Sequence, residues 1–184
     1  MEVLFATSNK NKVLESNKVG SEYQVSFTQI NVMYPEVRAE SVGAVAEEGA
    51  RYVYAQIKRP IIVEDSGLFI ESLNGFPGPF SSFVQHKIGN AGILKLLDGL
   101  EDRKAQFISA IGYCDKDKVE VFEGVVDGYI TFEERGRHGF GYDPIFMPKD
   151  STKTFAEDIK HKNEASHRRK STELLCRFLR KADE

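Results

Sequence analysis

The sequence has little of what marks secreted, metal-stabilised or membrane-spanning proteins. It contains two cysteines, Cys114 and Cys176, and neither lies in a CxxC pair or among histidines at zinc-ligand spacing. We therefore expect two reduced thiols that behave as small buried hydrophobic groups. No apolar run approaches the ~20 residues that a membrane-crossing helix needs, and the short apolar run 3–6 is no secretory leader. These absences favour a cytoplasmic protein with no membrane partner.

An excess of charge of one sign is also missing. The chain has 25 Lys+Arg and 28 Asp+Glu, a formal net charge of −3, whereas binding to a phosphate backbone needs a strongly basic face. We therefore expect no nucleic-acid partner. With 184 residues, of which 41% are hydrophobic, the chain is long enough to bury a core without disulfides. We expect residues 1–184 to form a single domain, made of one lobe or of two packed lobes.

Strand and helix patterns alternate at the start of the chain. Residues 2–7 predict a short strand, a polar loop follows, and a helical stretch ends near Gly20. A second strand is expected over residues 23–30. The run 61–63 has no polar alternation, so it predicts a strand that is buried on both faces and ends at the polar segment 64–67.

Longer helical patterns follow. Residues 41–58 carry apolar side chains at i, i+3, i+4 and i+7, which predicts one buried face with Arg51 on the opposite side. A further helix over 80–97 is expected to break near Gly89. The C-terminal helix has an apolar stripe of Leu174, Leu175, Phe178 and Leu179.

Two long strands, 104–113 and 118–130, are separated by a short turn and predict a β-hairpin, and a short strand is expected over 144–147. This antiparallel part joins strand–loop–helix units that are typical of parallel sheets. The combination predicts an α/β fold with a mixed β-sheet flanked by helices, and a cleft between two lobes.

The polar loop after the first strand has the composition of an anion site. It lies where a helix begins, so exposed N–H groups and the positive end of the helix dipole favour polyphosphate. Its residues are Thr7, Ser8, Asn9, Lys10, Asn11 and Lys12. An ordinary N-capped helix with solvated lysines explains the same pattern, and no GxxxxGK[ST] motif occurs.

Two acidic residues are candidates for a divalent cation. Asp65 follows the buried strand 61–63, and Glu36 follows Pro35 in a loop. Mg²⁺ takes one or two carboxylates together with phosphate oxygens and water, so this pair would be sufficient. A turn residue and a solvated surface acid are the plain alternatives.

An aromatic and glycine-rich segment would suit a nucleobase. Phe140, Gly141, Tyr142 and Asp143 combine stacking faces with a hydrogen-bond acceptor. The basic side chains that follow it along the chain, and that would add specificity, are Lys162, His167 and Arg168. Core packing and a solvated helix surface explain each of these residues singly. Nucleophilic catalysis is not indicated, because Ser66 lacks a GxSxG context and neither cysteine has a nearby histidine motif.

The chain resembles the inosine triphosphate pyrophosphatase family in segments that follow the family's order: ATSNKNK (6–12), VEDSGLFI (63–70), LNGFPGPFSSF (73–83), FGYDPIF (140–146), TFAE (154–157) and SHR (166–168). Members hydrolyse ITP, dITP and XTP to the monophosphate and pyrophosphate with Mg²⁺, which removes non-standard purines from the nucleotide pool. The resemblance also implies a cytosolic homodimer with an elongated mixed sheet and an active site between two lobes.

The resemblance implies a role for each candidate. Residues 7–12 would hold the triphosphate, Asp65 would be the catalytic acid, and Glu36 would be the second metal ligand. Asp65 would orient or deprotonate the water that attacks the α-phosphorus. Further substrate contacts would come from Ser66, from Phe140 to Asp143, and from Lys162, His167 and Arg168. One departure is Arg51, because many members place a lysine at this point of the helix.

Three other functions fit parts of the sequence. A nucleotide phosphatase or pyrophosphatase with little base preference would use the same phosphate loop. A nucleic-acid-binding module would use the basic residues Lys160, Lys162, Arg168, Arg169 and Lys170, against the net charge of −3. A nucleotide sensor would bind its ligand without consuming it.

Overall fold

The computed structural model of the chain describes residues 1–35 and 39–182. The elements, in order, are β1 (Glu2–Ala6), α1 (Lys10–Glu22), β2 (Ser26–Ile30), α2 (Val42–Ile57), β3 (Ile61–Ile70), a 3₁₀ turn η1 (Glu71–Leu73), β4 (Pro77–Gly78), α3 (Ser81–Leu96), β5 (Lys104–Cys114), β6 (Val119–Ile130), β7 (Phe146–Pro148), α4 (Ile159–Ala165) and α5 (His167–Ala182). Among these described helices, none has the length and apolar character needed to cross a membrane.

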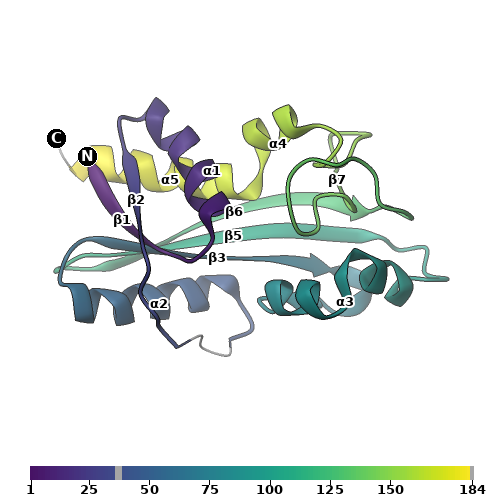
Figure 1. The fold of residues 1–184 in the computed structure, drawn as a ribbon, viewed down its shortest axis with the longest axis horizontal. Helices are drawn as coiled ribbons and strands as arrows, with labels where there is room; N and C mark the ends of the chain where they lie inside the picture. The colour runs from purple at the N-terminus through teal and green to yellow at the C-terminus, as the bar shows by residue number, and fades with distance from the viewer. Residues whose placement is uncertain (36–38, 183–184) are drawn as a thin grey trace. The chain divides into compact units, whose positions relative to one another are not determined.

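The strands form one mixed sheet in the order β2-β1-β3-β5-β6-β7, and β4 pairs with β3 (Figure 1). β1 runs parallel to both β2 and β3. β4 is antiparallel to β3, and β7 is antiparallel to β6. The mixed sheet flanked by helices confirms the α/β fold predicted from the sequence.

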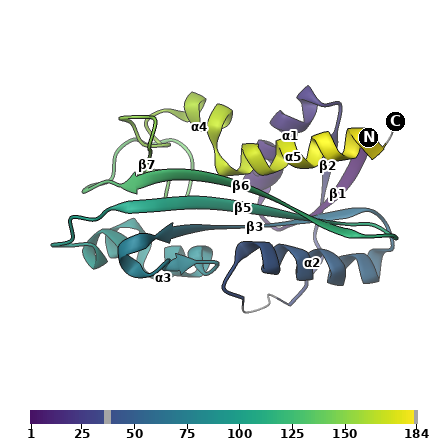
Figure 2. The ribbon, with the colours of Figure 1, turned by 180° about the vertical axis from the view of Figure 1, so that it is seen from behind.

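The chain divides into two compact units. The first consists of Met1–Asp65, Ser109–Gly124 and His167–Glu184. Within it, α1 and α5 lie on one face of the sheet and α2 on the other (Figures 1 and 2). Strand residues alternate between two cores: Phe5 and Ile62 pack with α5, whereas Ile61 and Val63 pack with α2. This alternation also fixes which way the polar residues that follow in β3 point.

The second unit consists of Ser66–Ile108 and Val125–Ser166. Its core joins sheet residues to α3 and to an aromatic group in which Phe107, Phe146 and Phe155 have ring centroids 4.6 to 6.2 Å apart. α3 changes direction at Gly89, whose φ of 62° lies in the left-handed region. This confirms the predicted break.

Several boundaries match the sequence analysis closely. The helix expected over 41–58 is α2, which Ser41 caps by accepting a hydrogen bond from the Ala44 N–H at 3.2 Å. The predicted hairpin is β5 and β6, which are neighbours in the sheet. Cys114 and Cys176 are both buried, with 4% and 0% exposure.

Two expectations are wrong. The strand at 61–63 does not end at Glu64; β3 continues to Ile70. Leu174 does not belong to the buried stripe of α5, because it is 44% exposed. The stripe instead runs from Leu179 and Leu175 back to Arg168, so its first turns bury polar side chains. These polar side chains belong to the site described next.

Candidate active site

The predicted polar segment 7–12 follows β1, but only Thr7, Ser8 and Asn9 form the loop; Lys10, Asn11 and Lys12 already belong to the first turn of α1. Asn9 is the N-cap of α1, and its Oδ1 accepts a hydrogen bond from the Asn11 N–H at 3.0 Å. Thr7 Oγ1 accepts one from the Asn9 N–H at 3.1 Å, and Gln29 donates to the Thr7 carbonyl at 2.9 Å. The loop is therefore shaped by its own side chains, with Ser8 and Lys10 exposed at the start of a thirteen-residue helix. The N-terminal end of a helix favours the binding of an anion.

The two lysines of this segment differ in their surroundings. Lys10 is exposed. The side chain of Lys12 is only 16% exposed and its ammonium lies 2.7 Å from Glu64 Oε2. The same ammonium donates to the Glu64 backbone carbonyl at 3.0 Å. Lys12 is therefore attached to β3 at two points.

Glu64 is the centre of a buried polar network. It points to the face of the sheet that α1 and α5 cover, since it lies two residues after Ile62. Its Oε1 accepts hydrogen bonds from Ser109 at 2.7 Å and from Arg168 Nη2 at 3.1 Å. Arg168 also contacts Glu15 Oε2 at 2.5 Å. Two cations and two carboxylates thus form a chain from α1 through β3 to α5.

Charge pairing decides the ionisation of this network. Burial alone would raise the pKa of Glu64, but Arg168 and Lys12 hold that pKa well below its ordinary value. Burial would likewise lower the pKa of Arg168, but Glu64 and Glu15 raise it. Both groups stay charged at neutral pH, which avoids the large free-energy penalty of an unpaired buried charge.

Asp65 lies next to this network in β3 but points to the opposite face of the sheet. It is half-buried. β1 pairs with β3 through Leu4–Ile61 and Phe5–Ile62 and ends at Ala6, so Asp65 lies beyond the carboxyl end of β1, where the Thr7 loop begins. Asp65 was expected at the end of its own strand, but it lies within β3 and beyond the end of the neighbouring strand β1.

Asp65 could hold a magnesium ion only if phosphate oxygens and water supplied most of the other ligands. Glu64 is not available as a ligand, because both of its carboxylate oxygens are engaged by cations. Glu36, the other predicted ligand, lies outside the described residues. Among residues 1–35 and 39–182, no three His, Cys, Asp or Glu side chains form a metal cage. An oxygen donor such as Asp65 is what Mg²⁺ uses when phosphate oxygens and water complete its shell.

The second unit holds the predicted base-binding segment. Asp143 and Lys162 are both buried, with 3% and 1% exposure, and Lys162 Nζ donates to Asp143 Oδ2 at 2.7 Å. The same oxygen accepts a hydrogen bond from the Phe140 N–H at 2.7 Å. The Lys162 ammonium lies 4.3 Å from the centre of the Phe140 ring. These three predicted residues therefore lie together.

Tyr142 and Gly141 have structural contacts in the same segment. The Tyr142 hydroxyl donates to the Ser81 carbonyl at 2.8 Å, and burial raises the pKa of this hydroxyl. Its ring belongs to the core of the unit, which is the packing alternative of the sequence analysis. The Gly141 carbonyl accepts hydrogen bonds from Gln85 at 3.0 Å and Asn90 at 3.2 Å. Phe140, in contrast to Tyr142, is partly exposed.

The remaining candidates lie in different units. His167 and Arg168 begin α5 in the first unit and are buried, with 4% and 2% exposure, whereas Lys162 and Ser66 belong to the second unit. The sequence analysis did not identify Glu64 as the partner of Lys12 and Arg168. The signal available was a glutamate directly after the apolar run 61–63, where a charge needs a partner.

Arg51 has the position that the helix pattern predicts. It lies on the exposed side of α2, where its Nη2 is 2.7 Å from Glu47 Oε1, one turn earlier. The Glu47 carboxylate raises the pKa of Arg51 through this hydrogen bond.

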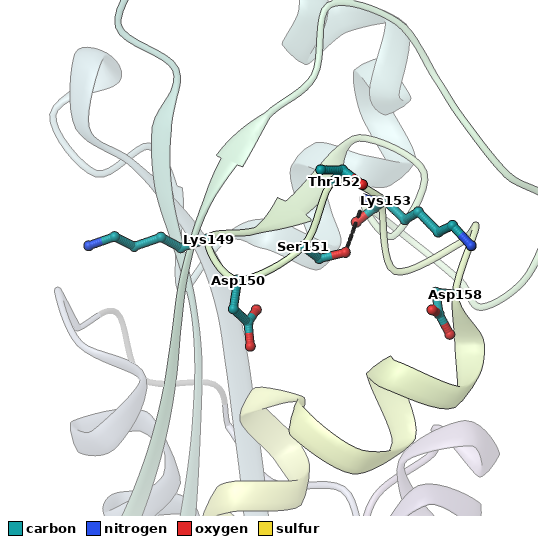
Figure 3. A pocket seen from close by; sticks show the side chains of 6 residues that line it. All are labelled: Lys149, Asp150, Ser151, Thr152, Lys153 and Asp158. Atoms are coloured by element: carbon teal, nitrogen blue, oxygen red, sulfur yellow. Dashed lines mark hydrogen bonds between the residues drawn. The ribbon is translucent and has the colours of Figure 1, made fainter.

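A surface hollow of about 570 Å³ lies in the second unit, on the turn between β7 and α4 (Figure 3). Its lining residues are Lys149, Asp150, Ser151, Thr152, Lys153 and Asp158. Asp158 accepts a hydrogen bond from the His161 N–H at 3.0 Å, and this bond lowers its pKa. The hollow contains none of the predicted site residues.

Comparison with known proteins identifies the family of the chain. The family model of the Ham1 family matches residues 3–178. The chain belongs to the Ham1 family. This confirms the membership that the motifs indicated. The described site residues all lie inside the matched range.

Curated relatives of this Ham1 chain match it over nearly their whole length. The dITP/XTP pyrophosphatase of Methanopyrus kandleri is 49% identical over 180 residues, which cover 97% of this chain and 96% of the relative. That of Pyrococcus horikoshii is 46% identical and covers 98% and 97%. Among solved structures, the Staphylococcus aureus Ham1 protein has a TM-score of 0.87 at 28% identity, covering 99% of this chain and all of the other. A Coxiella burnetii HAM1 protein has a TM-score of 0.85 at 29% identity, covering 98% and 99%.

Proposed function

We propose that this protein hydrolyses non-standard purine nucleoside triphosphates, namely ITP, dITP and XTP, to the nucleoside monophosphate and pyrophosphate. The curated relatives named dITP/XTP pyrophosphatase support this substrate class, at up to 49% identity over nearly the full chain. The observation that carries the proposal is the phosphate loop at the start of α1 with Asp65 beyond the end of β1. Together they offer an anion site and a carboxylate within one unit.

The first unit supplies the groups for the triphosphate. Residues 7–12 bind its oxygens through side chains and through the N-terminal end of α1. Lys12 provides a positive charge for the leaving pyrophosphate, which stabilises the charge that develops there in the transition state. Asp65 orients, or takes a proton from, the water that attacks the α-phosphorus.

Magnesium is part of this proposal. Asp65, together with Glu36, would hold the ion, and a bound Mg²⁺ supplies positive charge to the phosphate oxygens. The Asp65 carboxylate is half-buried and lies beside the loop, which suits this role. Removal of the metal by a chelator is therefore expected to stop turnover.

The purine base is assigned to Phe140–Asp143, with Ser66, Lys162, His167 and Arg168 as further contacts. Phe140 offers a partly exposed ring for stacking. Donors that face a 6-keto oxygen would be left unpaired opposite the 6-amino group of ATP, and this penalty discriminates against ATP. Residues 1–184 would act as one nucleotide-pyrophosphatase domain, in a cytoplasmic homodimer, as the resemblance implies.

The direct test is Asp65→Asn, with Asp117→Asn as the matched control on the exposed β5–β6 turn. Loss of a general base lowers turnover by roughly 10²–10⁴-fold. We expect this loss in Asp65→Asn, with an unchanged thermal unfolding midpoint, and full activity in the control. Near-normal pyrophosphate release by Asp65→Asn would refute the assignment. Release of orthophosphate by the wild-type protein would refute α–β cleavage.

A further inference from the structure

The polar network of the first unit contains a residue with no assigned role in nucleotide hydrolysis. Glu64 is 3% exposed and both of its carboxylate oxygens are held by cations, so its carboxylate is not available to a substrate. Yet it contacts two residues assigned to the substrate, Lys12 at 2.7 Å and Arg168 at 3.1 Å. On the basis of the function proposed above, we propose that Glu64 is a positioning residue that sets the direction of the Lys12 ammonium toward the triphosphate.

The geometry at Lys12 supports this role. An ammonium has three N–H donors. The Lys12 ammonium donates one hydrogen bond to the Glu64 backbone carbonyl at 3.0 Å and forms an ion pair with Glu64 Oε2 at 2.7 Å. Two contacts with one residue of a strand hold the flexible lysine stem in one orientation. The ammonium can then donate a further N–H to a phosphate oxygen.

The position of Lys12 in the network gives the same result. Its side chain is 16% exposed, whereas the side chains of Glu64 and Arg168 are 0% and 2% exposed. Glu15 is 18% exposed but is an anion, so Lys12 is the cation of the network that is most open to a phosphate oxygen. The other members, Ser109 and Glu15, support Glu64 and Arg168 from β5 and α1.

Glu64 is in turn held rigidly. Ser109 donates to its Oε1 at 2.7 Å, and the Ser109 hydroxyl lies 2.9 Å from that of Ser171 on α5. Side chains locked in this way keep a contacting group within the small tolerance that efficient catalysis requires. If the ion pair between Glu64 and Lys12 only held α1 to β3, its loss would lower stability but would not change catalysis through Lys12.

The test is a double-mutant cycle of Glu64→Gln and Lys12→Met, measured as kcat and KM for Mg²⁺-dependent pyrophosphate release. If Glu64 acts through Lys12, which binds the triphosphate and stabilises the leaving pyrophosphate, Glu64→Gln lowers kcat/KM by roughly 10–100-fold through a higher KM and a lower kcat, as the loss of a supporting partner does elsewhere. In the Lys12→Met background the same change has an effect of about twofold or less. A misfolded fraction would instead lower kcat equally in both backgrounds and leave KM unchanged, and equal effects in both backgrounds overturn the proposal.

Two further variants keep the test decisive. Glu22→Gln is the matched control, because the ion pair between Glu22 and Arg169 joins α1 to α5 at the surface. We expect unchanged kinetics for this variant. Ser109→Ala removes one hydrogen bond to Glu64 and no charge, so it serves if Glu64→Gln fails to fold. It should lower kcat/KM in wild type and not in Lys12→Met; the same loss in both contradicts the role of Glu64. Wild-type activity on ITP is measured first, and its absence would refute the proposed function instead.

Discussion

The ion pair between Asp143 and Lys162 makes a strong prediction about stability. The two side chains are 4% and 2% exposed, and Lys162 Nζ lies 2.7 Å from Asp143 Oδ2. Asparagine has nearly the shape of aspartate but no charge, so Asp143→Asn removes the buried ion pair at 2.7 Å. Removal of one partner of a buried pair costs about 3–5 kcal/mol of the free energy of unfolding. We expect a loss in this range.

The reverse substitution should cost less. Lys162→Met leaves the Asp143 carboxylate with the hydrogen bond from the Phe140 N–H, at 2.7 Å. A hydrogen bond to a charged group offsets part of the penalty, so we expect a loss of about 2–3 kcal/mol. The double variant removes both charges of the pair. Its loss should therefore be smaller than the sum of the two single losses by at least about 2 kcal/mol.

Urea unfolding at pH 7 measures these values. The chain has no tryptophan and seven tyrosines, so tyrosine fluorescence and circular dichroism are the two probes. Coincident curves would justify a two-state analysis. Asp150→Asn is the control: its carboxylate is 70% exposed and 3.4 Å from His161, and we expect a change below about 0.5 kcal/mol. A loss below about 1 kcal/mol in Asp143→Asn, or additive losses in the double variant, would refute the reasoning.

Three further predictions concern the first unit. The folded-state pKa of Glu64 lies below its ordinary value of 4.5, so the contribution of Glu64 to stability is complete above about pH 4.5 and is lost as the pH falls below that value. The difference in free energy of unfolding between wild type and Glu64→Gln should therefore shrink in this range. A difference that grows would contradict the ion pairing. Burial raises the pKa of Cys176 to about 12 and also raises that of Cys114, so a thiol reagent at pH 8 should label neither until urea unfolds the chain; rapid labelling of native protein would show that these thiols are accessible. A methyl group at Gly124 would collide with the His167 carbonyl at the start of α5, so Gly124→Ala should lower stability by about 1–3 kcal/mol in thermal unfolding, and an unchanged midpoint would show that α5 can shift.

The sequence was sufficient where local signals decide structure. The predicted helix 41–58 became α2, Val42–Ile57, because its apolar spacing and its Ser41 cap act within one segment. The succession of strand, polar N-cap and helix at the start of the chain was also predicted, since these three signals follow one another directly. The break at Gly89 needed only the permissive backbone of glycine.

The sequence was insufficient where distant residues decide structure. The polar segment after Val63 suggested a turn, yet β3 continues because Glu64 finds Lys12 and Arg168, which lie 52 and 104 positions away in the chain. The same network explains why polar residues, and not Leu174, continue the buried stripe of α5. The helix α4, Ile159–Ala165, was not predicted, because its sequence IKHKNEA has no clear apolar face.

Pyrophosphate release from XTP, dITP, ITP, ATP and GTP, each with Mg²⁺ and with a chelator, tests the central claim most directly. The account predicts metal-dependent release from XTP, dITP and ITP that far exceeds release from ATP and GTP, and none with the chelator. Equal release from all five would show a pyrophosphatase without base preference. Absence of release from all of them would contradict the proposed chemistry altogether.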